Sequence, residues 1–283
     1  MNVARVKVPA TTANLGPGFD CLGIALQLAN IVTVRRGDPS GRNAMAAAAA
    51  KAYFRRSNGK AFPFQWEITG AVPRSRGLGS SVTVRLGLLH GLNALSGSPL
   101  DAAEIFGLCA ELEGHPDNAA PAAFGGFTIA RPGAPLQRFP VNRTLQFVLL
   151  IPDFEMLTAE ARKVIPDAIP FRDAVRSAAN ASAIAAAFAA RDYALLEGAF
   201  DDWFHQPYRQ QLLPFLPKVI AAGRKAGALG GWLSGSGSTI ACATLANPER
   251  IAAAMMAAAG GRTAQIQIVR ADNAGVRIST SRS

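Results

Sequence analysis

The most informative stretch of this sequence reads Pro73-Arg74-Ser75-Arg76-Gly77-Leu78-Gly79-Ser80-Ser81. It lies between a segment with the alternating pattern of a strand and an apolar segment with the pattern of a helix. Gly77 and Gly79 let backbone N–H groups approach a ligand without an intervening Cβ. The following helix offers unpaired N–H groups and the positive end of its dipole, and Ser80 and Ser81 add hydroxyls. The stretch therefore predicts an anion site suited to a triphosphate.

This glycine-serine loop differs from the better-known phosphate-binding loops. It has no Gly-Lys-Ser/Thr and so is not a Walker A loop, and Val82 stands where a dinucleotide fingerprint has its third glycine. The chain also lacks the His-Arg-Asp and Asp-Phe-Gly motifs of protein kinases. A glycine-rich turn that only begins a helix is the alternative interpretation, and this motif alone does not decide between the two.

Strands and helices interleave on both sides of the loop. The hydrophobic pattern predicts strands at residues 3–8, 31–35, 64–69, 145–151, 239–244 and 264–270. Periodicity and capping residues predict helices at 43–55, 80–95, 98–114, 158–165, 172–190, 193–204 and 247–261, with Asn43, Ser98 and Asn247 as caps, and a Gly/Ser-rich turn at 230–238. The interleaving indicates an α+β or α/β class, with one domain at residues 1–143 and a second at 144–283.

The net charge of +10 raises the question of a nucleic-acid partner. No run of lysine or arginine exceeds two residues, and no motif that reads RNA or DNA is present. We therefore interpret the charge as a solvated basic surface that attracts an anionic substrate such as ATP, and expect no nucleic-acid partner. An apolar fraction of 49% and a charged fraction of 17% are typical of a folded chain with a sizeable core.

Cysteines and histidines are few and scattered. The cysteines are far apart in the sequence, which fits a reducing, cytoplasmic setting. The histidines do not have the spacing of a zinc site. The residues are Cys21, Cys109, Cys242, His90, His115 and His205. No uninterrupted apolar run is long enough to span a bilayer, and the first residues lack an apolar signal core. We expect neither membrane association nor export.

Two further motifs accompany the glycine-serine loop. Residues 8–26 read VPATTANLGPGFDCLGIAL, and residues 233–239 read LSGSGST. The three motifs in this order resemble the GHMP kinases, in which the first helps to shape the acceptor pocket, the second cradles the ATP phosphates and the third closes over the site. Three separated matches in the family's order are far more specific than any one of them.

Within that family the chain resembles the homoserine kinases. PATTANLGPGFD replaces the Gly-Glu-His type of first motif found in sugar and mevalonate members. Further similar segments are ELEGHPDNAAPAAFGGF at residues 111–127, TAEAR at 158–162, and PYR at 207–209 with LLP at 212–214. The resemblance therefore extends from residue 8 to about residue 239.

The resemblance implies a fold and a reaction. The fold is an α+β, two-domain GHMP architecture with an N-terminal ribosomal-S5-domain-2-like domain that holds ATP and a C-terminal ferredoxin-like domain. The reaction is ATP- and Mg²⁺-dependent phosphorylation of the side-chain hydroxyl of L-homoserine to O-phospho-L-homoserine, a step of threonine biosynthesis. Members of the family are usually homodimers, so the resemblance implies a homodimer.

Homoserine carries an ammonium, a carboxylate and a hydroxyl, so its pocket needs an anion, a cation and a polar group. By resemblance, Asp20 meets the amine, and Arg162 and Arg209 supply guanidinium groups for the carboxylate. The six expected acceptor-site residues are Asn14, Asp20, His115, Asn118, Arg162 and Arg209. Arg162 and Asn118 are also the catalytic candidates. Whether Arg162 contacts the carboxylate, the hydroxyl or the transition-state charge stays open.

Each of these side chains has an ordinary structural alternative. Asp20 is also suited to capping a turn, His115 to bonding backbone in the core and Asn118 to a turn. Arg162 and Arg209 are also compatible with solvated helix surfaces, which is the usual place of an arginine. The joint match to the motifs favours the functional interpretation.

By resemblance, the nine residues from Pro73 to Ser81 bind the ATP phosphates, and Ser81 and Glu111 bind Mg²⁺ through oxygen. Glu113 is the rival ligand, and a surface carboxylate is the structural alternative for either glutamate. Phosphoryl transfer depends mostly on positioning and charge neutralisation, so we name no general base.

The chain departs from the family at two places. The loop 35–43 is short, which leaves the adenine-side wall and a role for Asn43 beside the nucleotide open. After the serines, Val82-Thr83-Val84-Arg85 replaces a run of small residues, and Arg85 is expected to contact phosphate or a carboxylate such as Glu111. Rival functions are a GHMP kinase for another small alcohol, a non-catalytic ligand sensor of the same fold, and a nucleic-acid-binding module.

Overall fold

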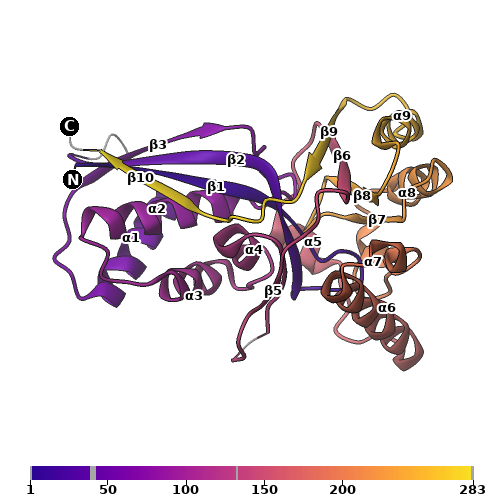
Figure 1. Ribbon diagram of the computed structural model, residues 1–283, viewed down its shortest axis with the longest axis horizontal. Helices are drawn as coiled ribbons and strands as arrows, with labels where there is room; N and C mark the ends of the chain where they lie inside the picture. Colours follow the sequence, from indigo (N-terminus) through magenta and orange to yellow (C-terminus); the bar gives the residue numbers. More distant parts are fainter. Residues whose placement is uncertain (1, 39–42, 132, 282–283) are drawn as a thin grey trace.

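A computed structural model describes residues 2–38, 43–131 and 133–281, and its strands form two antiparallel sheets (Figure 1). The first sheet has the order β10-β1-β2-β4-β5, with β3 also paired to β2, and the second has the order β7-β8-β6-β9. The predicted mixture of strands and helices is confirmed. No described helix is long and apolar enough to cross a membrane.

The first sheet is built on the long hairpin of β1 and β2, and four helices cover one of its faces (Figure 1). Its strands are β1 (Val3–Ala13), β2 (Leu22–Arg36), β3 (Phe64–Gly70), β4 (Phe127–Ile129), β5 (Gln137–Phe139) and β10 (Arg277–Ser281). The helices are α1 (Ala44–Ser57), α2 (Ser80–Leu95), α3 (Ala102–Glu113) and α4 (Ala119–Phe124). Asn43 caps α1 as predicted, because its side chain accepts a hydrogen bond from the Ala46 N–H at 3.0 Å.

Helix α2 lies very close to the hairpin because it presents glycine to it. A Cβ added at Gly87 would lie 2.4 Å from Val32, and one added at Gly91 would lie 2.4 Å from Val34. The absence of these methyl groups lets the helix axis approach the sheet. The close packing fixes the position of the first turn of α2, which carries Ser80 and Ser81.

The start of α3 differs from the predicted one. Ser98 was expected to cap this helix, but the N-cap is Asp101, whose side chain accepts from Glu104 N–H while the Glu104 side chain accepts from Asp101 N–H. This capping box satisfies two unpaired donors at once. Ser98 instead has a φ of 61° and donates its N–H to Asn93 at 2.8 Å, which closes the end of α2.

The second sheet has a ferredoxin-like order, since β6, α8, β7, β8, α9 and β9 form a βαββαβ unit into which α5, α6, η1 and α7 are inserted between β6 and α8. Helices α8 and α9 bury their apolar sides against it. The strands are β6 (Gln146–Pro152), β7 (Gly230–Leu233), β8 (Ile240–Thr244) and β9 (Ala264–Arg270). The helices are α5 (Thr158–Lys163), α6 (Phe171–Ala190), α7 (Gln206–Arg209), α8 (Leu216–Lys225) and α9 (Pro248–Ala258).

Two predictions in this half were wrong. Residues 193–204 were expected to form one helix, but only the 3₁₀ turn η1 (Tyr193–Leu196) forms. The Asp202 carboxylate accepts from three backbone N–H groups, of Phe204, His205 and Gln206, and so begins α7 instead. Residues 230–233 were expected in a turn but form β7, where glycine is required because a Cβ at Gly231 would lie 2.8 Å from Cys242 Sγ.

The chain returns to the first sheet at its end, where β10 pairs with β1 in the register Val3 to Ser281. A division after residue 143 would assign β10 to the second domain, although its ladder lies in the first sheet. Between the sheets a single apolar cluster runs from β2 and β4 to β6 and α6, with Phe127 stacked on Phe188 at 4.1 Å. The two halves therefore share a core where they meet.

We expect acid to destabilise the fold through two buried histidines. Burial lowers the pKa of His90 and of His205 from 6.5 to about 4, so the unfolded chain binds these protons at higher pH than the folded chain. The free energy of unfolding should fall as the pH drops from 6.5 to 4, by about 3 kcal/mol for each histidine. Urea unfolding at pH 7, 5.5 and 4 measures this fall.

The variant His90→Gln should lose about half of this pH dependence. His115 does not contribute to it, because its pKa is raised and its share of the stability is lost only as the pH rises above 6.5. An identical pH profile for the wild type and His90→Gln would contradict the assignment.

Candidate active site

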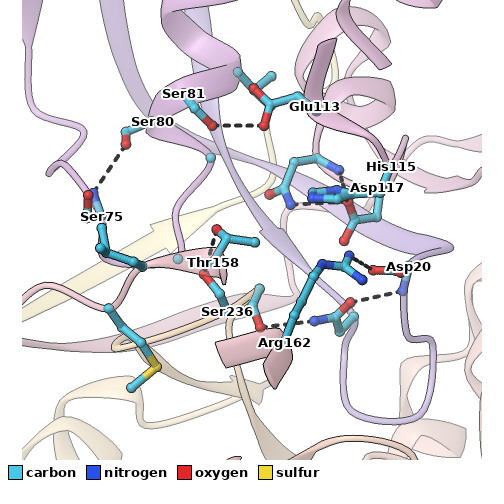
Figure 2. Close-up of a pocket in the computed structure, with 18 of the residues that line it drawn as sticks. Asp20, Ser75, Ser80, Ser81, Glu113, His115, Asp117, Thr158, Arg162 and Ser236 are labelled. Atoms are coloured by element: carbon cyan, nitrogen blue, oxygen red, sulfur yellow. Dashed lines mark hydrogen bonds and ion pairs between the residues drawn. The ribbon is translucent and has the colours of Figure 1, made fainter. Parts of the chain in front are cut away.

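A cavity of about 170 Å³ opens where the two halves meet (Figure 2). Six segments line it: residues 14–20 after β1, the glycine-serine loop with the start of α2, residues 113–118 at the end of α3 and beyond it, residues 156–162 with α5, Arg209 of α7, and residues 235–236 after β7. All three sequence motifs therefore meet here.

Only part of the glycine-serine loop lines the cavity. Gly77, Gly79, Ser80 and Ser81 line it together with Ser75. The other predicted phosphate contacts serve the loop's own anchoring: Leu78 is buried in the core, and Arg76 donates to the Pro152 carbonyl at 2.9 Å and pairs with Asp153. Pro73 and Arg74 form the approach to the loop, away from the lining residues.

Helix α2 starts at the cavity with glycine as its N-cap. Gly79 has a φ of 68° and no side chain with which to cap the helix, so the first N–H groups of α2 are available to an outside acceptor. A helix N-terminus of this kind favours anions through both its N–H groups and its dipole. These N–H groups are the ones that the predicted anion site would use.

Ser81 lies beside Glu113, not beside Glu111. The Ser81 hydroxyl donates to Glu113 Oε2 at 3.0 Å (Figure 2), and Arg85 Nη1 lies 2.5 Å from Glu113 Oε1. Residues two apart on a helix point about 200° away from each other, so α3 can present only one of the two glutamates to α2. Glu111 instead lines a separate hollow with Phe106.

On the opposite side of the cavity, Asp20 and Arg162 form an ion pair of 2.6 Å (Figure 2). Their side chains are 33% and 38% exposed, so the pair is open to the cavity. Asn14 holds the Asp20 loop in place, since Asn14 Oδ1 accepts from Asp20 N–H at 3.1 Å and Asn14 Nδ2 donates to the Gly235 carbonyl at 3.0 Å.

Arg209 reaches the same cavity from α7 but is almost fully buried. Its guanidinium donates to the Ala161 and Gly235 carbonyls at 3.0 and 2.9 Å and contacts His205 Nδ1 at 3.2 Å. Burial and the nearby charge of Arg162 lower the pKa of Arg209 to about 10, so the group stays positive at neutral pH. Within the described part of the chain, Arg209 has no carboxylate at ion-pair distance.

His115 and Asn118 are held by Asp117. The Asp117 carboxylate oxygen Oδ1 lies 2.7 Å from His115 Nδ1 and accepts from the Asn118 N–H at 2.8 Å. The hydrogen bond to Asp117 raises the pKa of His115. Asn118 Oδ1 accepts from the Thr11 hydroxyl at 2.6 Å, which fixes the amide beside Gly79.

All six predicted acceptor-site residues thus line one cavity with Ser81. Sequence reasoning assigned no role to Asp117, Thr158 or Ser236, although each lies inside a motif that it quoted. The buried position of Asp117 between His115 and Asn118 was the missing information. Asn43, whose role beside the nucleotide was left open, caps α1 and is not among the residues that line this cavity, and residues 39–42 of the same loop lie outside the described residues.

Asp20, His115 and Asp117 place one ligand-type atom each within 4.8 Å of one another. The Arg162 guanidinium already neutralises Asp20, and the raised pKa of His115 favours its protonated form, which cannot bind a metal. This cluster is therefore better suited to a substrate cation or hydroxyl than to a metal ion.

Comparison with known proteins agrees with this arrangement. Residues 44–126 match the GHMP kinases N terminal domain, and residues 184–261 match the GHMP kinases C terminal domain. A homoserine kinase of Moorella thermoacetica is 39% identical, with 89% of this chain and 91% of that protein covered. One from Aquifex aeolicus is 34% identical, with 97% and 99% covered. The crystal structure of homoserine kinase from Cytophaga hutchinsonii superposes with a TM-score of 0.89 at 26% identity, covering 99% of this chain and 98% of that one.

We expect Gly79→Ala to abolish tight nucleotide binding. A Cβ at Gly79 would lie 2.2 Å from Thr11 Oγ1, which is bonded to Asn118, and the positive φ adds about 1–2 kcal/mol of strain. The affinity for ADP, measured by calorimetry, should fall at least ~10-fold, and stability should fall as well.

Gly97→Ala is the matched control. Gly97 also has a positive φ, of 85°, but a Cβ there meets nothing within 4 Å. This variant should lose only the stability due to the backbone strain and should bind ADP like the wild type. Equal losses of ADP affinity in the two variants would contradict the role given to Gly79.

Proposed function

This chain belongs to the GHMP kinases, and from that premise we propose that it transfers the γ-phosphoryl group of ATP to the side-chain hydroxyl of L-homoserine. The product is O-phospho-L-homoserine, an intermediate of threonine biosynthesis. Two of its relatives, at 39% and 34% identity, carry the name homoserine kinase. The observation that carries the assignment is Arg209, a buried cation at the cavity. Within the described residues it is hydrogen-bonded only to carbonyls and a histidine, lies over the Phe19 ring, and has no carboxylate at ion-pair distance.

A buried guanidinium without a carboxylate is costly, and a substrate carboxylate would remove that cost. A planar guanidinium binds a carboxylate through two parallel hydrogen bonds. Arg162 lies near enough to Arg209 to lower its pKa, so both cations can face one carboxylate. These features support an acceptor substrate that carries a carboxylate.

The Asp20–Arg162 pair suits the rest of a zwitterion. In the structure the two side chains neutralise each other at 2.6 Å. An amino acid that enters the cavity can offer its ammonium to Asp20 and its carboxylate to Arg162, so one ion pair is exchanged for two. An alcohol without an amine would leave Asp20 with a weaker partner than the one it lost. This argument favours homoserine over the acceptors of other GHMP kinases.

Asn118 is the residue that we assign to the substrate hydroxyl. It lies between the charged acceptor residues and the glycine-serine loop, and a Cβ at Gly79 would be only 3.3 Å from its Oδ1. Its bonds to Thr11 and Asp117 hold the amide in one orientation. Holding the hydroxyl in line with the γ-phosphate can supply about 7–11 kcal/mol of the barrier reduction, so no strong general base is required.

ATP would place its phosphates against the N–H groups at the start of α2. The residues beside that site also fit Mg²⁺, because the Ser81 hydroxyl and the Glu113 carboxylate are the hard oxygen donors that this cation takes. When bound, Mg²⁺ neutralises charge on the transferred phosphoryl group. Glu113 therefore replaces Glu111 as the proposed metal ligand. The free cysteines Cys21, Cys109 and Cys242 fit a reducing cytoplasm, where we place the reaction.

Homoserine-dependent release of ADP from ATP tests the acceptor directly, and Asp20→Asn tests its recognition. Loss of a charged partner for the ammonium removes about 1.5–3 kcal/mol, so the KM for homoserine should rise roughly 10- to 150-fold while the KM for ATP stays within twofold. Asp173→Asn removes a similarly half-buried aspartate of α6 that pairs with Arg176, and it should leave both constants unchanged. Full activity on another alcohol and none on homoserine would refute the proposal.

The metal site is tested by the pair Glu113→Gln and Glu111→Gln. Glu113→Gln should raise the Mg²⁺ concentration needed for half-maximal turnover at least ~10-fold, because it removes the anionic ligand beside Ser81. Glu111→Gln, two residues away on the same helix, should behave like the wild type. The reverse result would restore Glu111 as the ligand.

A further inference from the structure

Arg85 forms an ion pair with the proposed metal ligand and has no role in the function as described so far. Its Nη1 lies 2.5 Å from Glu113 Oε1, with side chains that are 20% and 8% exposed. Ser81, which donates to the other oxygen of the same carboxylate, lies four residues earlier on α2. Because residues four apart share one helix face, α2 presents a hydroxyl and a cation together to a single glutamate of α3.

Each oxygen of the Glu113 carboxylate has one of these two contacts. Oε1 is turned to Arg85. Oε2 is turned to Ser81 at the wall of the cavity, as Figure 2 shows. The Arg85 contact is one of charge: neither Arg85 Nε nor Glu113 Oε1 has a hydrogen-bond partner in the described chain. Among the described residues, only Ser81 and Arg85 hold this carboxylate. Without Arg85, its orientation would depend on one neutral hydroxyl.

Arg85 also lies in the wrong place to contact a phosphate itself. It is one helical turn beyond Ser81, away from the residues that line the cavity. The Arg85 charge is close to the buried thiol of Cys109, which lies one turn before Glu113 on α3. Burial and Glu113 raise the pKa of this thiol, and Arg85 opposes that rise. The guanidinium is therefore enclosed between α2 and α3, behind the carboxylate that faces the cavity.

We propose that Arg85 is a positioning residue, which holds Glu113 so that Oε2 stays beside Ser81 for the divalent cation that accompanies ATP. The inference rests on the proposed function, because it takes Glu113 as the metal ligand. A cation in this place holds one carboxylate oxygen and keeps the other fixed beside the Ser81 hydroxyl. It also balances a charge that would otherwise be buried alone whenever the nucleotide is absent.

A double-mutant cycle on the full chain tests the proposal. Arg85→Met, Glu113→Gln and the double variant are titrated with ADP by calorimetry at a series of Mg²⁺ concentrations, without homoserine. Arg85→Met should raise the Mg²⁺ concentration that gives half of the metal-dependent gain in ADP affinity by about 10-fold. In the Glu113→Gln background the same substitution should change it less than twofold. Arg85→Lys, which keeps the charge, should recover much of the loss.

Arg56→Met serves as the matched control, because Arg56 also pairs with a glutamate of α3, Glu104 at 3.5 Å, outside the cavity. It should leave the Mg²⁺ dependence unchanged. An Mg²⁺ requirement that is unchanged or lower in Arg85→Met overturns the proposal. So does an equal effect in both backgrounds, and so does a loss of ADP affinity without metal, which would indicate direct phosphate contact.

The double variant removes both charges, so it leaves no buried ion without a partner. The unfolding temperature of each variant identifies any variant that does not fold. Because these titrations contain no homoserine, their outcome is separate from that of the acceptor assignment. If Arg85 behaves as expected and homoserine is not phosphorylated, only the identity of the alcohol is wrong.

Discussion

The structure depends on the close contact of three backbone segments around residues 77–79. The Gly77 carbonyl accepts from the Ser234 hydroxyl at 2.7 Å, and the Leu78 carbonyl accepts from Thr11 N–H at 3.2 Å. A Cβ at Gly77 would lie 2.1 Å from the Ser234 carbonyl, so no larger residue fits there. These contacts join the two halves of the chain and fix the start of α2 at their junction. An anion site made of backbone N–H groups requires this rigidity, because such groups have no side-chain freedom with which to adjust.

Around this frame the charges are arranged in pairs. Two carboxylates at the cavity each have a guanidinium partner, since Asp20 pairs with Arg162 and Glu113 with Arg85, and Asp117 is bonded to His115, whose pKa it raises. Arg209 is the exception, because it is a buried cation with no carboxylate at ion-pair distance among the described residues. Such a cation matches a ligand that brings its own carboxylate. The proposed triphosphate side is different, since it offers the N–H groups at the start of α2 and the oxygens of Ser81 and Glu113.

Much of the site could be predicted from the sequence because its residues lie in short contiguous motifs. Asn14 and Asp20 share one loop, and His115 and Asn118 share another, so locating each motif located its residues. The sequence favoured Glu111 beside Ser81, where the structure has Glu113, because the motif contains two glutamates and does not state the rotation of its helix. That rotation is set by packing: Ile105 and Cys109 are buried, and Glu113 continues their face at the next turn. The spacing of the apolar residues in the sequence therefore indicated the rotation of α3. By contrast, β10 is exposed along its whole length and carries no pattern that reveals its pairing with β1.

The departure at Arg85 shows how a family site can be kept while its surroundings change. A charged residue that is mostly buried one turn into a helix is unfavourable unless a partner of opposite charge is already fixed nearby. Glu113 is such a partner, and it is held by α3 through the capping box at Asp101 and the buried face of the helix. The same pair also restricts the carboxylate to one orientation, because a guanidinium on one oxygen and a hydroxyl on the other leave little freedom of rotation. An arginine that neutralises a buried carboxylate can therefore also fix the orientation of that carboxylate. This requires the arginine to approach from the side opposite to the cavity, as Arg85 does.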